Sequence, residues 1–493
     1  MLFGGDDKTA SKAQVAKQPL RRDSRSTGVV FFIGRFMAHS LSITNGTDTV
    51  SLTDSGVFLT RYSPQPPSVR ANSVRGLDGD DVSDPVYENV TETIELLPYA
   101  NSTSTLQAVV NGIERLIDYA RQRQRYRSGP RVYLQLQVDG EGSTYRSEIL
   151  HGRFEPGEES LAVWGNYQFP SKLYITRRYF WEGALTELQL SSTGVGAATG
   201  GRTIHNHDDS DAFNDNWVQI AAAQVGGAIP APLRITLQNT TGSAQGYRNI
   251  YMSVNAYSDP ANFTHIIEGE TIVSGYGTAT SLSTCSGGSY VARSLSAGTT
   301  QMHWPITSAQ LQDTQGRDFR LIMRITTQPS LNIYATACIY DTDGLIPLAI
   351  GDEVLISTSA NALIDLGTLP IPPGGYNTTF GAARLVMLLR TSGSTSIGID
   401  FIQLTPTDSF RRLYQRGYNA PSNSYIIDDG IEGYTVLQES SVDYPIYTVY
   451  NSPLTVFPNR LQRIIILHDE GSSAPVANTF SIRAYYRPRR LTI

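Results

Sequence analysis

The sequence has 493 residues, more than one hydrophobic core usually supports, so we expect about two to four domains. Charged residues make up only 17% of the chain and the formal net charge is −6, so bulk charge gives no evidence for a nucleic-acid-binding surface. Two cysteines are too few for a disulfide scaffold. We interpret Cys285 and Cys338 as buried free thiols, with a single bridge between them as the alternative.

The composition favours β structure. Glycine (43) and proline (25) interrupt the chain often, and Thr, Ser and Tyr are abundant. We predict a mainly β fold: an α+β domain with one long helix on a β-sandwich, then a jelly-roll-like β domain and a small β C-terminal segment.

Residues 1–35 are predicted to form an extended N-terminal arm. No apolar periodicity supports a core there, and a disordered tail is the alternative interpretation. One apolar stretch lies near its end: Val29, Val30, Phe31, Phe32 and Ile33. This stretch is far shorter than the ~20 residues that a membrane span needs, so we predict no membrane insertion. We predict instead that it contacts another subunit, as a strand added to a neighbour's sheet edge.

The clearest element is an amphipathic helix over residues 106–127. Its apolar residues recur at the spacing that places them on one face: Leu106, Val109, Val110, Ile113, Leu116, Ile117 and Ala120. Ser104 is the predicted N-cap, with Gln107 as its capping-box partner, and Gly129-Pro130 is the predicted stop. We expect the apolar face to pack on a sheet.

Four arginines occupy the last turns of this helix: Arg121, Arg123, Arg125 and Arg127. The helix dipole favours cations at this end. A nucleic-acid patch is one interpretation of the four. We favour contacts between subunits or capping of the dipole, and we treat them as tentative assembly contacts.

Short alternating segments surround the helix. Residues 36–90 carry strand-like pieces, a hairpin signal at Asn45-Gly46, and a stiff break at residues 63–67. After the helix, period-2 alternation predicts strands over residues 131–139, 144–154, 161–169 and 173–178. We therefore expect one α+β domain over residues 36–190.

The rest of the chain is predicted to be β. Residues 191–216 are rich in Gly, Ser and Thr and then acidic, which predicts a flexible linker. Residues 217–407 have the pattern of a sandwich or jelly roll. Residues 408–493 form either a third small domain or a returning segment that completes the first.

No motif predicts catalysis. The sequence has no Gly-x-Ser-x-Gly elbow, Walker loop or Cys-x-x-Cys, and we predict no enzyme, no catalytic residue, no cofactor and no metal. Two clusters contain metal-ligand residue types, but neither predicts a metal site. His205 and His207, beside Asp208, Asp209 and Asp211, lie in the expected linker, where rigid ligand geometry is lacking. Asp341-x-Asp343-Gly344 lacks the later glutamate of a calcium loop and predicts a β-turn.

The order of elements over residues 36–190 resembles the siphophage tail proteins of the distal-tail and tail-tube kind. It consists of strands, the helix at 106–127, then Arg131-Val-Tyr-Leu-Gln-Leu, Tyr145-Arg-Ser-Glu-Ile-Leu-His-Gly and Arg177-Arg-Tyr-Phe-Trp-Glu-Gly. The resemblance covers about a third of the chain. It implies a β-sandwich with one helix that forms rings, which stack around a channel for DNA. The second domain resembles carbohydrate-binding-like jelly rolls.

The expected function is therefore a structural subunit of a phage tail, either the repeating tube subunit or the distal ring. Implied partners are copies of itself, other tail proteins, DNA as passing cargo and a host-surface glycan. Its place would be the virion, after synthesis in the host cytoplasm, since residues 1–25 lack the apolar core of a secretory signal. The alternative is a carbohydrate-binding adhesin. Trp217 and Trp304 could stack on sugars, although core positions are commoner for tryptophan.

Overall fold

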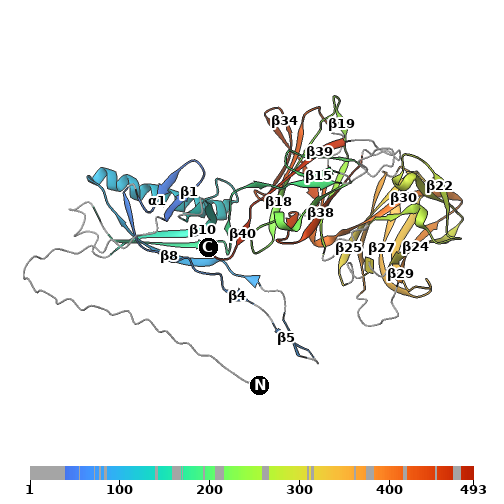
Figure 1. The fold of residues 1–493 in the computed structure, drawn as a ribbon, viewed down its shortest axis with the longest axis horizontal. Helices are drawn as coiled ribbons and strands as arrows, with labels where there is room; N and C mark the ends of the chain where they lie inside the picture. The colour runs from blue at the N-terminus through green and yellow to red at the C-terminus, as the bar shows by residue number, and fades with distance from the viewer. Residues whose placement is uncertain are drawn as a thin grey trace, which may run out of the picture.

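The computed structural model describes residues 39–54, 56–70, 73–76, 79–82, 86–138, 143–157, 168, 170–192, 195–205, 216–257, 266–307, 310–311, 316–359, 362–372, 382–414, 419–449, 452–469 and 479–493. These residues form a mainly β structure with one long helix, α1 (Thr103–Tyr126), which confirms the predicted fold class. Three bodies follow one another along the long axis (Figure 1). We call them the first, middle and inserted bodies.

The first body is a nine-stranded sheet covered by α1. Its main path is β2-β1-β9-β10-β11-β8-β3, with β12 beside β10 and β40 beside β12. The strands are β1 (Ser40–Thr44), β2 (Thr49–Ser51), β3 (Val57–Arg61), β8 (Val90–Pro98), β9 (Tyr133–Gln137), β10 (Thr144–Pro156), β11 (Ser171–Arg177), β12 (Trp181–Glu182) and β40 (Arg489–Arg490). The first half of β10 pairs with β9 and its second half with β11, and a register shift follows Ile149. Most of the predicted strand at 161–169 lies outside the described residues.

Helix α1 buries the predicted face against this sheet. The buried side chains are Leu106, Ile113, Leu116, Ile117 and Ala120. A Cβ on Gly152 of β10 would lie 2.9 Å from the Ile117 side chain, so glycine permits the close contact between helix and strand. The predicted cap is wrong by two residues. Ser102, not Ser104, is the N-cap, because its Oγ accepts the Thr105 N–H.

The middle body consists of two large sheets around one apolar core. One sheet has the path β13-β39-β18-β33-β34-β35 with β16 and β37 attached, and the other is β15-β14-β17-β38-β20-β31-β36. The first contains β13 (Thr186–Glu187), β16 (Arg202–His205), β18 (Ala231–Gln238), β33 (Tyr425–Asp429), β34 (Tyr434–Glu439), β35 (Val442–Pro445), β37 (Thr455–Val456) and β39 (Thr479–Tyr486). The second contains β14 (Leu190–Ser192), β15 (Val195–Ala198), β17 (Trp217–Ile220), β20 (Asn249–Tyr257), β31 (Phe410–Tyr414), β36 (Tyr447–Val449) and β38 (Leu461–Asp469). A small pair, β19 (Gln245–Gly246) and β32 (Asn419–Ala420), completes the body.

The inserted body leaves the middle body after β20 and returns before β31. Its six-stranded sheet, β22-β23-β30-β25-β28 with β21, packs on a four-stranded sheet, β24-β29-β26-β27, around one apolar cluster. The strands are β21 (Ile266–Glu268), β22 (Thr278–Ser281), β23 (Ser289–Leu295), β24 (Gly298–Thr307), β25 (Asp318–Thr327), β26 (Ile333–Tyr340), β27 (Pro347–Ile356), β28 (Leu363–Pro370), β29 (Ala382–Thr391) and β30 (Thr395–Pro406). This body is a β-sandwich.

Three predicted boundaries differ from the structure. Residues 195–198 and 202–205, which composition places in a linker, are the paired strands β15 and β16. The predicted domain 217–407 is divided, because β17, β18 and β20 belong to the middle body and β21 to β30 form the inserted body. The 408–493 segment is neither a separate domain nor a completion of the first body. Among the described strands, β31 to β39 complete the middle body, and only β40 returns to the first. Backbone pairing with distant strands accounts for these differences.

Candidate assembly surface

A hairpin projects from the first body without joining its sheet (Figure 1). Among the strands that the structure describes, β4 (Val69–Arg70) and β7 (Val86–Tyr87) pair only with each other, as do β5 (Ser73–Gly76) and β6 (Gly79–Val82). Val69 and Val86 are 55% and 63% exposed. A two-stranded hairpin is at best marginally stable alone in water. These strands therefore form a surface that a partner can complete.

The base of the hairpin is fixed by a buried ion pair. Arg177 Nη2 of β11 lies 2.7 Å from Glu92 Oε1 of β8, and both side chains are almost wholly buried. Glu92 also accepts the Tyr62 hydroxyl at 2.9 Å and the Gln65 N–H at 2.8 Å. Arg177 in turn donates to the Gln65 carbonyl at 3.0 Å. The pair thus holds the proline-rich segment that leads out of β3 into the hairpin.

Burial of this network also sets its protonation. Desolvation, followed by the Glu92 charge, raises the pKa of Tyr62, so its hydroxyl stays protonated and donates to the carboxylate. The Arg177 guanidinium lies 4.4 Å from the Trp181 ring centroid, a cation–π contact on its other side. These contacts together hold the base of the hairpin against the first body.

The returning strand of the hairpin is held by a second set of contacts. Tyr87 stacks on Tyr179 with ring centroids 5.5 Å apart. Glu88 accepts the Ser68 hydroxyl at 2.8 Å and pairs with Arg70 at 2.6 Å, although this ion pair is exposed and contributes little. Both ends of the hairpin are thus fixed to the first body.

The four predicted arginines divide into two pairs. Arg121 donates to the Gly152 carbonyl at 3.0 Å, and Arg123 donates to the Gly129 carbonyl near the helix end. Arg127 takes a left-handed conformation, with φ of 55°, and closes the helix. Arg121, Arg125 and Arg127 are exposed, and Arg123 is half-buried. Since Arg121 and Arg123 donate to carbonyls of their own chain, we expect Arg125 and Arg127 to be the more accessible to a partner, while the stretch 29–33 lies outside the described residues.

Two tryptophans considered as sugar platforms have other contacts. Trp304 is fully buried in the inserted body and donates its Nε1–H to the Gly269 carbonyl at 3.0 Å. The Arg463 guanidinium lies 3.6 Å from the Trp217 ring centroid.

Neither cysteine forms a disulfide and both are buried, as predicted, and burial raises the pKa of the Cys338 thiol to about 11.

The predicted turn at Asp341 is confirmed. Its carboxylate accepts the Leu345 and Ile346 N–H groups at 2.7 and 3.1 Å, and these bonds lower its pKa. His205 lies on β16, whereas the other members of its cluster lie outside the described residues. Among the described residues no group of three or more His, Cys, Asp or Glu side chains could hold a metal ion. No helix in the described part is long and apolar enough to cross a bilayer.

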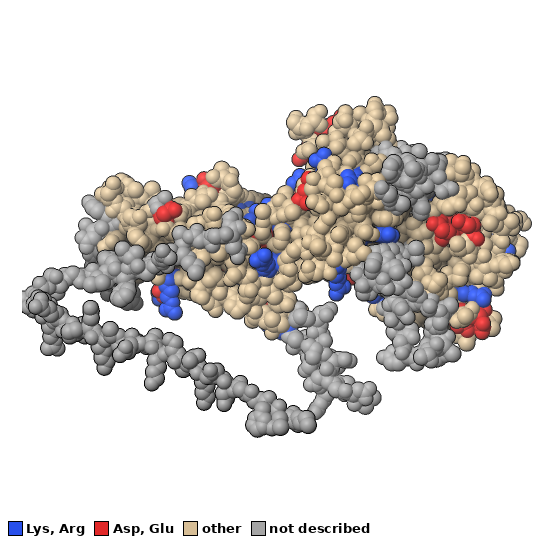
Figure 2. Space-filling view, in the orientation of Figure 1, with Lys and Arg blue, Asp and Glu red and all other residues tan. Residues whose placement is uncertain are grey.

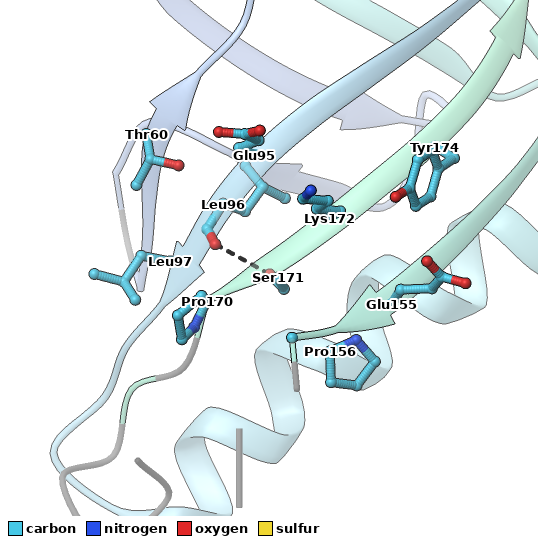
Figure 3. Close-up of a pocket in the computed structure, with 11 residues that line it drawn as sticks. Thr60, Glu95, Leu96, Leu97, Glu155, Pro156, Pro170, Ser171, Lys172 and Tyr174 are labelled. Atoms are coloured by element: carbon cyan, nitrogen blue, oxygen red, sulfur yellow. Dashed lines mark hydrogen bonds between the residues drawn. The ribbon is translucent and has the colours of Figure 1, made fainter. Parts of the chain in front are cut away.

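One pocket of the first body is an open depression of about 620 Å³ beside β3, β8, β10 and β11 (Figure 3). Lys172 lies directly between Glu95 and Glu155 across the strands. Ser171 donates to the Leu96 carbonyl at 3.2 Å. The described lining residues include no histidine or cysteine. This arrangement is an alternating row of charges on a sheet face.

The charged residues on the face shown in Figure 2 are scattered in small groups of both signs. This agrees with the low charged fraction of the sequence.

The sequence predicts one feature of the projecting hairpin, the stiff break at residues 63–67 that precedes it. Nothing in the alternation of residues 69–87 indicates that the hairpin stays outside the sheet.

No protein-family model and no curated protein matches this sequence. Among solved structures, the chain aligns with SPP1 Dit (gp 19.1), described as a paradigm of the hub adsorption apparatus in phages that infect Gram-positive hosts. The alignment covers 92% of this chain and 99% of the other, at 6% identity and a TM-score of 0.33. The phage P2 baseplate in its activated conformation with Ca aligns over 74% of this chain and 98% of the other, at 11% identity and a TM-score of 0.24. At such identities and TM-scores, the function of this chain has to be argued from its own residues.

Proposed function

We propose that this chain is a structural subunit of a bacteriophage tail and assembles with copies of itself into a ring. The observation that carries the proposal is the projecting hairpin. Its described strands pair only with each other and not with the sheet of the first body, and Val69 and Val86 are exposed. The resemblance of the first body's element order to siphophage tail proteins supports the choice of a tail.

The physical reason lies in the contrast between the hairpin and its base. The base is rigid because Glu92 and Arg177 hold it on both sides. The described strands beyond it pair with no third strand, and a two-stranded hairpin is at best marginally stable alone. A neighbouring subunit can supply both, by strand pairing and by covering the exposed valines. Identical copies present the same hairpin and the same sheet edges, so the contact repeats around a ring.

Finer parts of the proposal concern the arm and the helix end. The stretch 29–33 would pair with a free edge of a neighbour's first-body sheet, for which β2 and β3 are the end strands. Arg125 and Arg127 would face a neighbour. The ring would be part of the virion tail, bound to other tail proteins, with DNA as passing cargo.

The experiment tests the hairpin directly. Val69→Ser with Val86→Ser is expected to shift the purified chain from rings toward monomers, measured by mass photometry and negative-stain microscopy. The matched control is Leu345→Ser with Ile346→Ser, which removes two exposed aliphatic side chains from the inserted body. The control should form rings as the full chain does. Rings from the hairpin variant in equal yield would overturn the proposal.

The arm is tested by a chain that starts at Gly34. It is expected to fold and form rings but to stack into shorter assemblies than the full chain. Stacks of normal length would refute the role of the arm. Monomers of the full chain that are retained on a host-glycan column would favour the adhesin alternative instead.

A further inference from the structure

The first and middle bodies have separate apolar cores, and a polar joint connects them. The first-body cluster includes Trp181, and the middle-body cluster includes Tyr486. Interfaces between domains are commonly polar, and relative motion is expected unless specific contacts prevent it. The contacts of this joint therefore decide whether the two bodies move as one.

The last residues of the chain pass between the two bodies. Arg489 of β40 is opposite Glu182 of β12 in the first body. On its other side, the Arg489 carbonyl accepts the Ala228 N–H of the middle body at 2.7 Å. A Cβ on Gly227 would lie 2.7 Å from the Arg489 carbonyl oxygen, and Gly227 has a φ of +104°, so this position requires glycine. One backbone segment thus pairs with both bodies.

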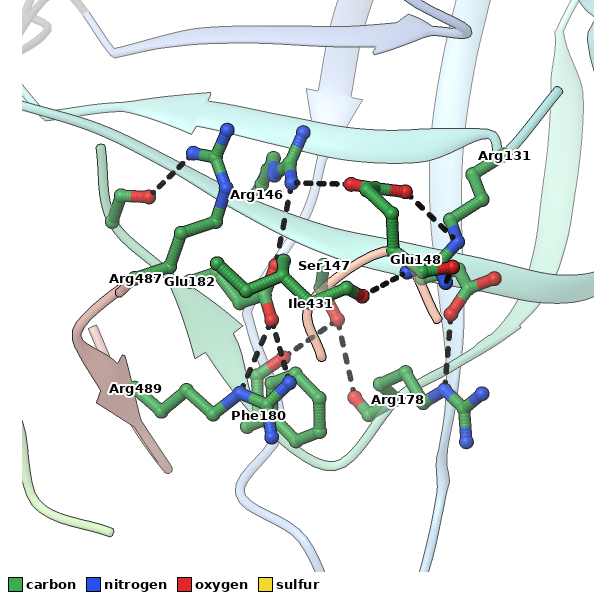
Figure 4. Close-up of polar contacts among 12 residues, drawn as sticks. Arg131, Arg146, Ser147, Glu148, Arg178, Phe180, Glu182, Ile431, Arg487 and Arg489 are labelled. Atoms are coloured by element: carbon green, nitrogen blue, oxygen red, sulfur yellow. Dashed lines mark hydrogen bonds and ion pairs between the residues drawn. The ribbon is translucent and has the colours of Figure 1, made fainter. Parts of the chain in front are cut away.

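The Arg489 side chain reinforces this backbone connection (Figure 4). Its Nε and Nη2 donate to Glu182 Oε1 at 3.1 and 2.8 Å. The guanidinium also lies 3.8 Å from the centroid of the Phe180 ring. The Glu182 side chain is only 8% exposed, so a cationic partner is needed to offset the cost of burying the carboxylate.

A row of alternating charges continues from Glu182 into the middle body. Arg146 Nη2 lies 3.5 Å from Glu182 and 3.7 Å from Glu432, which belongs to the turn between β33 and β34. Arg131 donates to the Ile431 and Glu432 carbonyls at 3.0 and 2.8 Å. Figure 4 shows these side chains converging from strands of both bodies. The joint is therefore one connected network of cations and carboxylates.

We propose that residues 487–490 form a C-terminal clasp that locks the middle body onto the first. With the clasp closed, the two bodies are one rigid unit. Without it, each body keeps its own core and sheet, and the two hinge about the segment between β12 and β13. The remaining contacts, from Arg131 and Arg146 to a turn of the middle body, hold only one side of the joint.

The clasp joins residues that are far apart in the sequence, because Arg489 and Glu182 are separated by 307 positions. Domains fold in order as they are synthesised, so the first body forms before its partner strand β40 is made. Closing so long a loop costs little more than closing a shorter one. The clasp therefore forms only after β40 has been synthesised.

The test measures the distance distribution between the two bodies within one chain. Spin labels at Asn111→Cys on α1 and Glu439→Cys on β34 occupy exposed positions, and the natural cysteines are buried. Labelled protein is diluted with unlabelled chain so that distances within a single chain are read even in rings. The full chain should give one narrow distribution. A chain that ends at Tyr486, and so lacks the whole clasp, should give a broad one.

The matched control ends at Arg490 and lacks only residues 491–493, beyond the clasp. Its distribution should stay narrow. Glu182→Gln is a second variant, which keeps the side-chain size and decides the question if the shortened chain does not fold. It should also broaden the distribution, while Arg490→Ala should not. A narrow distribution from folded Glu182→Gln protein, or from a folded chain that ends at Tyr486, would overturn the clasp.

Discussion

The middle body has two joints of opposite character. Its joint with the first body is the charged network around Glu182 and Glu432. Its joint with the inserted body is an apolar cluster formed by both: Tyr251, Phe410 and Leu467 from the middle body, and Ile322, Leu363 and Phe401 from the inserted one. Beside it, Asn216 donates a buried hydrogen bond to Gln403 at 3.3 Å, and the Arg320 guanidinium lies 5.4 Å from the Phe410 ring centroid.

The difference determines how each joint responds to its surroundings. Apolar contact is insensitive to ionic strength and is distributed over many atoms. Contacts between charges depend on each partner and weaken with salt where they reach solvent. We therefore infer that packing fixes the inserted body to the middle body. The position of the first body depends instead on individual charged residues and on the salt concentration.

The largest expected effect comes from breaking the apolar joint. Phe401→Ala removes a fully buried ring from the cluster and should lower the free energy of unfolding by about 3–5 kcal/mol. Denaturant unfolding followed by tryptophan fluorescence measures this loss. Leu355→Ala, an exposed position on β27, is the control and should change stability by less than about 0.5 kcal/mol. A loss below ~1 kcal/mol at Phe401 would show that the ring is not part of the joint's stability.

A smaller effect is expected at the charged joint. Glu432→Gln removes the ion pairs with Arg131 and Arg146 but keeps the backbone acceptor for Arg131. The Glu432 side chain is 38% exposed, so the loss should stay below about 1 kcal/mol. Unfolding midpoints at low and high salt should converge in this variant. Glu353→Gln, which removes an exposed ion pair of the inserted body, is the control. Equal salt dependence of the unfolding midpoint in Glu432→Gln and in the full chain would contradict the prediction.

The smallest expected effect is on the pH dependence of stability, through a buried carboxyl group of the middle body. Burial raises the pKa of Asp428, against the lowering effects of Arg411 at 3.0 Å and the Thr435 hydroxyl. The folded state therefore binds the proton more tightly than the unfolded state. Its contribution to stability should fall as pH rises from the ordinary aspartate value through the raised one, and stay constant above it.

Asp428→Asn should remove this part of the pH dependence, so its stability curve should be flatter in that window. Thermal unfolding across acidic to neutral pH measures the slope. Asp343→Asn, at an exposed turn, is the comparison and should keep the slope of the full chain. If Asp428→Asn keeps that slope as well, the carboxyl does not titrate as proposed.

The sequence predicted those features that local periodicity determines. The apolar face of α1 follows from the spacing of Leu106, Ile113 and Leu116, and the strand β10 follows from its alternation. The N-cap was missed because Ser102 and Ser104 are equally suitable by composition. The backbone geometry at Thr105 selects between them.

Long-range pairing was not predictable in this way. Alternation shows that β38 has a buried face, but not that its partner is β20, more than two hundred residues earlier. Strand β15 has little alternation of its own and is held by pairing with β14. The same limit applies to the hairpin of the candidate assembly surface, because only the tertiary arrangement keeps β4 and β7 apart from the sheet.

The inserted body enters and leaves through neighbouring strands, since Ser253 of β20 is opposite Phe410 of β31. The inserted body is therefore a separable insertion, because a short turn could join the two strands and leave the sheet of the middle body continuous. Exchange is constrained by the apolar joint. Tyr251, Phe410 and Leu467 would be exposed by removal, so a replacement module must bring an apolar surface of its own. Such a module would change the surface at this end of the molecule while the first body stays the same.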